Sequence, residues 1–361
     1  MFFRRKKNTQ REWAIGLDFG ANQLRGVLIG RQVVALRYKT VDKPSPTANA
    51  CTAFGYCLEA FDVRPFVSVV GKADSIAEAA ATVAQLFNGW NTPGRCAFVV
   101  INPVGAIINQ TELPSMPLPE AREALRFNQR NLGNCYFDLA ENGASDVKNA
   151  KMQLLVGAAT REEVLWYRDV MVAAKVRPMA IELSTLTVVN GLLLTEPELC
   201  QNETVLLLDI RAKTTAMNFL QKGRLLFTYV MNSGSSQITK HLALKLNLDL
   251  ETAEQLQKSA PVEEFMQPAI APLAHELRAT IDFFEGQHEC RVGRVFACGD
   301  LAGAPKNLEI LSRESGIHIE AWDFLQRLDI TKTRGGDSAQ LAAVAPNLGA
   351  AVGAALARLS G

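Results

Sequence analysis

The stretch Trp13-Ala-Ile-Gly-Leu-Asp-Phe-Gly20 places an aspartate and a glycine at the end of an apolar run. Such a run is typical of a buried β-strand, and the chain then predicts a second strand from Gln23 to Ile29, a turn at Gly30 and a third strand from Gln32 to Arg37. A carboxylate at the end of a strand can hold a hydrated Mg²⁺, and a glycine lets backbone N–H groups approach a phosphate closely. An ordinary turn explains an Asp-x-Gly triplet equally well, so the triplet alone does not identify a site.

A second copy of this pattern begins near the middle of the chain. The run Thr204-Val-Leu-Leu-Leu-Asp-Ile210 predicts a strand, which is followed by a strand from Thr215 to Leu220, a turn at Gly223 and a strand from Arg224 to Val230. Two such copies predict a duplicated α/β domain with a cleft between the halves. Asp18 and Asp209, each at the end of a first strand, would face one another there and share one metal–triphosphate.

The segments around the two copies alternate between helix and strand patterns. A proline-rich stretch, Leu113-Pro-Ser-Met-Pro-Leu-Pro119, continues neither a helix nor a central strand and indicates a boundary, behind which we expect an inserted α/β subdomain. Further predicted elements are a helix that starts near Ser75, a strand over Cys96–Ile101, a helix over Glu120–Asn131, a strand over Met152–Ala159, a helix with Val164, Tyr167, Met171 and Ala174 on one face, a strand over Arg294–Gly299, and helices with apolar stripes at Leu273–Phe284 and Leu348–Leu359.

Composition excludes several classes of protein. Lys plus Arg number 38 and Asp plus Glu 37, so the net charge of +1 lacks the basic footprint of nucleic-acid binding. The seven cysteines and four histidines show no metal-site spacing, and we expect no transition metal. No apolar stretch reaches the roughly 18 to 20 residues of a membrane span, and the chain is not expected to cross a bilayer. The basic residues 4–7 near the N-terminus fit a solvated tail or, less well, a contact with anionic lipid.

The order of several motifs resembles the PilM family, FtsA-like cytoplasmic proteins of type IV pilus assembly. The motifs are Ile15-Gly-Leu-Asp-Phe-Gly20, Leu113-Pro-Ser-Met-Pro-Leu-Pro119, Val205-Leu-Leu-Leu-Asp-Ile210, Glu276-Leu-Arg-Ala-Thr-Ile-Asp-Phe-Phe284 and Cys298-Gly-Asp-Leu-Ala-Gly303. The resemblance implies an actin-like ATPase fold, with duplicated ribonuclease-H-like lobes around a nucleotide cleft and an FtsA-type inserted subdomain. The boundaries it implies are 1–11 for a flexible basic N-terminus, 12–111 and 179–202 for core subdomain 1A, 112–178 for the inserted subdomain, 203–241 and 295–361 for core subdomain 2A, and 242–294 for subdomain 2B.

The resemblance also implies a site for ATP or ADP with Mg²⁺ in the cleft. The residues implied in nucleotide binding are Asp18, Gly20, Asn22 and Arg25 in the first hairpin, Asp209 and Arg211 in the second, Glu254 in subdomain 2B, and Gly299 and Asp300 in the adenosine loop, with Asp18 and Asp209 holding Mg²⁺ through water. Glu182, where the chain crosses between lobes, is the expected residue for orienting an attacking water, although helix capping explains a charge there as well.

Several of these positions depart from the family pattern. Arg25 replaces a lysine, Arg211 replaces a glycine, and Asp300 replaces a glycine of a Gly-Gly-Gly loop, which predicts a degenerate ATP site and at most weak ATPase activity. In subdomain 2B, Lys258 is shifted by one position, and about 100° of helical rotation predicts that it does not take the place of the family lysine. Two hypotheses stay open for Arg211: its side chain obstructs the pocket, or its guanidinium pairs with a phosphate.

The function implied is that of a scaffold. It would bind the N-terminal cytoplasmic tail of a PilN-like single-pass membrane protein, contact other pilus platform proteins, form a homo-oligomer in some settings, and lie in the cytoplasm as a peripheral component of the inner membrane. Alternatives are an FtsA-like division protein and a metabolite kinase of the actin and sugar-kinase superfamily. The first is disfavoured because the sequence shows no basic amphipathic helix at its end, and the second because Arg211 damages the phosphate clamp.

Overall fold

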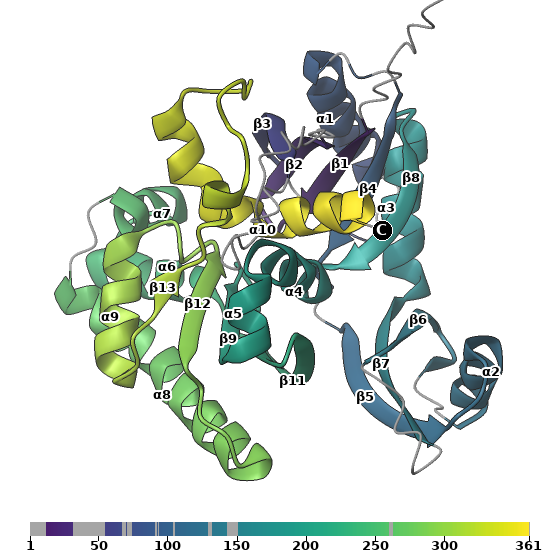
Figure 1. Ribbon diagram of the computed structural model, residues 1–361. Helices are drawn as coiled ribbons and strands as arrows, with labels where there is room; N and C mark the ends of the chain where they lie inside the picture. The colour runs from purple at the N-terminus through teal and green to yellow at the C-terminus, as the bar shows by residue number, and fades with distance from the viewer. Residues whose placement is uncertain are drawn as a thin grey trace, which may run out of the picture.

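A computed structural model describes residues 12–31, 55–66, 70, 74–90, 92, 94–103, 105–128, 132–142, 151–259 and 263–360. The expected basic N-terminus at 1–11 and the strand predicted over Gln32–Arg37 lie outside these ranges. Three β-sheets and their covering helices make up the described part of the chain (Figure 1).

The first two sheets have five strands each and the same strand order. The first sheet runs β3-β2-β1-β4-β8, with bounds β1 (Glu12–Phe19), β2 (Gln23–Arg31), β3 (Tyr56–Pro65), β4 (Cys96–Ile101) and β8 (Arg177–Leu183). The second runs β11-β10-β9-β12-β13, with bounds β9 (Thr204–Ile210), β10 (Thr215–Gln221), β11 (Arg224–Met231), β12 (Arg294–Gly299) and β13 (Glu320–Ala321). The central strand of the first sheet, β1, pairs antiparallel with β2 and parallel with β4. The central strand of the second sheet, β9, pairs in the same way with β10 and β12, which confirms the predicted duplication.

The helices cover these sheets and connect them. Their bounds are α1 (Asp74–Trp90), α2 (Leu118–Asn128), α3 (Arg161–Ala173), α4 (Ser184–Thr195), α5 (Pro197–Asn202), α6 (Ser235–Leu246), α7 (Leu250–Ser259), α8 (Glu263–His288), α9 (Pro305–Ser315) and α10 (Ser338–Ser360), with a short 3₁₀-helix at Phe324–Arg327. The helices α1 and α3 share a core with the outer face of the first sheet, and α6, α8 and α9 share one with the outer face of the second. Between the sheets lie α4 and α10, which share a third core with both (Figure 1).

The crossing of α4 and α10 depends on a residue without a side chain. A Cβ at Gly353 would lie 1.8 Å from the backbone oxygen of Thr187, so only glycine permits the two helices to approach this closely. By length and composition α10 could cross a membrane, which the sequence prediction overlooked. Most of α10 is buried, and it contacts α4, β1 and β2, so in this fold it is a core helix.

The two turns predicted in the duplicated halves have different outcomes. Lys222 and Gly223 both have positive φ, 51° and 70°, and form the tight hairpin turn between β10 and β11, as predicted. The turn predicted at Gly30 is wrong, because β2 continues through Gly30 to Arg31 and pairs there with β3. A Cβ at Gly30 would lie 2.1 Å from the carboxylate of Glu59 on β3, which is the end of a flexible side chain.

A third sheet, of order β5-β7-β6, stands apart from the other two (Figure 1). Its strands are β5 (Ile107–Pro114), β6 (Cys135–Glu141) and β7 (Lys151–Thr160), and α2 packs on it around a small core with Ala121 and Leu125. Helix α3 begins directly after β7, where Thr160 accepts a hydrogen bond from the Glu163 N–H and donates one to the Glu163 carboxylate. The expected insertion, residues 112–178, includes α3. In the structure α3 packs against α1 and the first sheet, and it shares their core.

Candidate functional site

The alternation of side chains along β1 and β9 places Asp18 and Asp209 opposite one another. In β9, Val205 and Leu207 point into the core shared with α10, so Asp209 points the same way at the end of the strand. In β1, Ala14 faces that same core, and Asp18 lies on the same face of the strand because an even number of residues separates the two positions. Both carboxylates are almost fully buried, with 0% and 2% exposure, on the faces of the two sheets that share this core.

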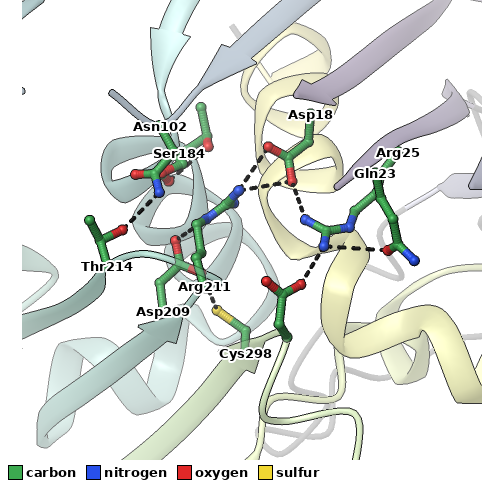
Figure 2. Close-up of polar contacts among 11 residues, drawn as sticks. Asp18, Gln23, Arg25, Asn102, Ser184, Asp209, Arg211, Thr214 and Cys298 are labelled. Carbon is green, nitrogen blue, oxygen red and sulfur yellow. Dashed lines mark hydrogen bonds and ion pairs between the residues drawn. The ribbon is translucent and has the colours of Figure 1, made fainter. Parts of the chain in front are cut away.

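The side chain of Arg211 lies between the two aspartates (Figure 2). Its Nη1 donates to both carboxylate oxygens of Asp18, at 2.9 and 3.1 Å, and its Nε donates to Oδ2 of Asp209 at 2.8 Å. The residue is 5% exposed. A guanidinium therefore lies where the sequence predicted that a metal ion would be shared.

A second arginine extends the cluster across the cleft. Nη1 of Arg25 donates to Oδ2 of Asp18 at 3.2 Å, and Nη2 of Arg25 pairs with Asp300. The Sγ of Cys298 lies 3.8 Å from Oδ1 of Asp209. All four carboxylate oxygens of the aspartate pair thus accept a hydrogen bond from the protein itself.

Burial and mutual attraction determine the ionisation of this cluster. Burial alone would lower the pKa of Arg211, but Asp18 and Asp209 raise that pKa well above its ordinary value. Burial raises the pKa of Asp209, and Arg211 opposes this shift. Burial, and then the charge of Asp209, raise the pKa of the Cys298 thiol. Arg211 is therefore a permanent cation, and it compensates two carboxylates that would be costly to bury alone.

Uncharged side chains join the two lobes beside the cluster. Nδ2 of Asn102 donates to Oγ1 of Thr214 at 2.8 Å, and Oγ of Ser184 donates to Oδ1 of Asn102 at 3.0 Å (Figure 2). These residues were not predicted from the sequence. Asn102 and Ser184 each come directly after a strand of the first sheet, β4 or β8, and polar residues at the carboxyl ends of parallel strands were a signal that could have found them.

The loop after β12 retains one glycine for a clear physical reason. Gly299 has a φ of +88°, and a Cβ there would lie 2.5 Å from the backbone oxygen of Ile210. The turn carries Asp300 toward Arg25 in the other lobe. Of the predicted nucleotide-loop residues, Gly299 shapes the loop and Asp300 serves as an ion-pair partner.

Two cavities flank the cluster. The outer cavity, of about 280 Å³, is lined by Asn22, Glu254 and Lys258, with 2.5 Å between Lys258 Nζ and the Glu254 carboxylate, and by residues of α6, α9 and α10. The inner cavity, of about 220 Å³, is lined by Gly20, Arg211 and residues of α3. Lys258, although shifted along its helix, lines the same cavity as Glu254.

Glu182 does not join the cluster. It lies in β8 and lines a third cavity, of about 440 Å³, between the first sheet and the third sheet. Burial raises the pKa of its carboxyl group. We call this cavity the insertion groove and define it by β6 residues Tyr136–Ala140, β8 residues Ala180–Leu183, and Leu186 and Asn190 of α4.

Comparison with known proteins identifies the family. The family model described as "Type IV pilus assembly protein PilM" matches residues 112–359. The chain belongs to the PilM family. The solved structure of a "PilM-PilN type IV pilus biogenesis complex" is similar over 95% of this chain and 98% of its own, at 22% identity and a TM-score of 0.78. The ethanolamine utilization protein EutJ from Carboxydothermus hydrogenoformans is similar over 96% of this chain and 89% of its own, at 13% identity and a TM-score of 0.56.

These matches place the PilM family chain in the actin-like ATPase fold and confirm the predicted family and fold class. A search of curated proteins gives no match for the chain. PilM family membership assigns the chain to type IV pilus assembly.

Proposed function

We propose that the chain is a scaffold of type IV pilus assembly that binds the N-terminal cytoplasmic tail of a PilN-like single-pass membrane protein in the insertion groove. The PilM family match supports the pilus role. One structure of similar fold is that of a PilM–PilN complex, which supports a PilN-like partner. Binding to such a tail would hold the protein at the inner membrane as a peripheral component.

The observation that carries this proposal is that two strand edges border the groove. Strand β8 is the last strand of the first sheet, and β6 is the last strand of the third sheet. Neither edge pairs with another strand among the residues described. An unpaired edge presents a row of backbone N–H and C=O groups, and an extended peptide can add to it as a further strand.

The side chains of the groove indicate which tail would fit. Most are apolar, including Leu139, Ala158 and Leu186, and Tyr136 at the rim is 44% exposed. Within the described parts of the chain, nothing forms an ion pair or hydrogen bond with the carboxylate of Glu182. A tail with apolar residues at alternate positions and one basic residue opposite Glu182 would satisfy the backbone edge, the apolar wall and the carboxylate together.

Catalysis is not part of the proposed function. The residues around Asp18 and Asp209 do not fit a magnesium–triphosphate, because Arg211, Arg25 and Cys298 already occupy the oxygens that would face the metal. A kinase or an efficient ATPase needs those oxygens to coordinate or position the metal. A scaffold does not.

The test is a titration of tail peptides from PilN-like membrane proteins, labelled with a fluorophore and followed by anisotropy. We expect saturable binding, and at least tenfold weaker binding to Glu182→Lys, which puts a like charge opposite the basic residue of the tail. Glu123→Lys is the matched control, since Glu123 lies on α2, pairs with Arg126 and does not line the groove. Absence of binding, or an equal loss in both variants, would contradict the proposal.

A further inference from the structure

A second cavity of the inserted subdomain lies beside the insertion groove. Its volume is about 410 Å³, and three arginines line it, Arg122 and Arg126 of α2 and Arg161 at the start of α3. We call this cavity the arginine pocket. Tyr136 and Phe137 of β6 line both the arginine pocket and the insertion groove, so the two cavities meet at the start of this strand.

Aromatic rings hold the three guanidinium groups. The guanidinium carbon of Arg122 lies 5.8 Å from the centre of the Phe137 ring, and that of Arg126 lies 5.7 Å from the same centre. The guanidinium carbon of Arg161 lies 4.9 Å from the centre of the Tyr136 ring. A guanidinium is attracted to the face of an aromatic ring, and its N–H groups stay available for hydrogen bonds in the plane of the group. Stacking therefore fixes the directions in which the pocket offers its donors.

The described carboxylates do not balance the three arginines. Arg122 pairs with Asp138, and Arg126 pairs with Glu123 at 3.1 Å. These two carboxylates are 81% and 69% exposed, so water screens both pairs and a ligand can replace them at little cost. Arg161 forms no ion pair with any residue that the structure describes, and none of the described lining residues is acidic. The pocket therefore keeps an uncompensated positive charge.

Among the anions that such a pocket accepts, a peptide carboxylate fits the rest of the molecule. The net charge of +1 gives no basic surface for a nucleic acid. Segments that bind anionic lipid carry about 4–8 Lys or Arg, more than the three of this pocket. An arginine fork matches the planar carboxylate of Asp or Glu with two parallel hydrogen bonds. The pocket also opens onto the groove that would hold an extended tail, so an acidic side chain of that tail can reach it.

We propose that the arginine pocket binds an acidic residue of the tail that occupies the insertion groove. This inference rests on the proposed function and adds a second charged contact to it. The tail then carries a basic residue for Glu182 and an acidic residue for Arg161, which are separate contacts because Glu182 does not line the arginine pocket. Two contacts of opposite sign fix the direction in which the tail lies along the strand edges, and they select against tails that carry only one sign of charge.

The experiment repeats the anisotropy titration with tail peptides in which each acidic residue in turn is replaced by Lys. We expect one replacement to weaken binding about fivefold or more, and Arg161→Glu to weaken binding of the unaltered peptide by a similar factor. Arg161→Glu and that Lys peptide should bind one another more tightly than either binds the unaltered partner, because the reversed charges attract again. Arg168→Glu is the matched control, since Arg168 lies on the same helix, pairs with Asp169 and does not line the pocket.

The outcomes separate this proposal from the proposed function. Absence of tail binding would contradict both. Tail binding that depends on Glu182 but is unchanged by Arg161→Glu, or a reversed pair that does not recover affinity, would overturn the arginine pocket alone. A loss of affinity in Glu123→Lys would also overturn it, because that variant releases Arg126 and adds a cation beside the pocket.

Anionic lipid is the rival occupant of the pocket. We expect Arg161→Glu to leave co-sedimentation of the peptide-free protein with phosphatidylglycerol vesicles unchanged. A loss of vesicle binding together with an unchanged tail affinity would assign the pocket to lipid headgroups and overturn the proposal. Thermal unfolding shows whether Arg161→Glu is folded, and Arg161→Gln, which removes the charge without reversing it, takes its place in the titration if it is not.

Discussion

The interlobe cleft and the insertion groove differ in how their polar groups are satisfied. In the cleft, two arginines compensate buried carboxylates from both lobes. In the groove, Glu182 lies half-buried beside two strand edges that no described strand covers. In the cleft an internal cation compensates the carboxylates, whereas in the proposed function the groove takes an external partner. This difference is consistent with the proposed binding of a partner at the insertion groove, while the cleft joins the lobes.

The largest effect that would test this comparison is expected at Arg211. Arg211→Ala leaves Asp18 and Asp209 buried without their main compensating charge, and breaking a buried ion pair from one side costs about 3–5 kcal/mol. We expect a loss of this size in the free energy of urea unfolding. Lys213→Ala, an exposed cation in the same loop, should change it by less than about 0.5 kcal/mol. A loss below about 1 kcal/mol for Arg211→Ala would show that the cleft does not need its internal cation.

A smaller effect is expected for the Arg25–Asp300 ion pair, which joins the two lobes. Arg25 is 4% exposed and Asp300 19%, so their pair is only partly screened by water. A double-mutant cycle of Arg25→Ala and Asp300→Ala should give a coupling of about 1–3 kcal/mol in unfolding free energy. A coupling near zero would mean that the Arg25–Asp300 pair does not help to hold the lobes together.

Much of this architecture could be predicted from the sequence. Apolar runs that end in Asp18 and Asp209 identified the duplicated first strands. The proline-rich stretch Leu113–Pro119 was expected to precede the inserted subdomain, but it joins β5 to α2, and the third sheet already begins at Ile107. The predicted turn at Gly30 is wrong because glycine occurs both in tight turns and inside strands, and the local sequence does not separate the two.

The state of the candidate site was harder to predict than its position. The sequence predicted an aspartate pair and left two hypotheses for Arg211, because a long side chain can swing toward or away from a neighbour. The position of the guanidinium between Asp18 and Asp209 favours obstruction of the metal position. Asn307 and Asn347 could not be predicted to lie together, because α9 and α10 bring them to the outer cavity only in the folded chain.

We expect Glu182 in the insertion groove to make the free energy of unfolding depend on pH. Burial raises the folded-state pKa of Glu182 above its ordinary value of 4.5, so the folded protein binds this proton more tightly than the unfolded chain. The contribution of Glu182 to stability is then greatest below its ordinary pKa and is lost as the pH rises through the raised folded-state pKa. Glu182→Gln should therefore stabilise the peptide-free protein by up to about 1 kcal/mol at pH 7, and this gain should vanish at acidic pH.

Urea unfolding at several pH values measures this gain, and Glu123→Gln, outside the groove, is the control. A basic residue of the tail would lower the pKa of Glu182 again, so tail binding should release a proton and strengthen as the pH rises through the raised pKa. A tail affinity that falls over this range would contradict the pairing of Glu182 with a cation.

The smallest effect is expected where an ion pair lies at the mouth of the cleft instead of inside it. Glu254 and Lys258 are one turn apart on α7, 40% and 49% exposed, and joined at 2.5 Å, which is closer than Arg211 is to either aspartate. Distance alone would predict the stronger pair, but exposed helical pairs contribute only about 0.3–0.5 kcal/mol because water and salt screen them. Lys258→Ala should therefore lower the unfolding free energy by no more than this amount, and high salt should abolish the difference. If Lys258→Ala cost as much as Arg211→Ala, burial would not be what separates the internal cation of the cleft from the charges around it.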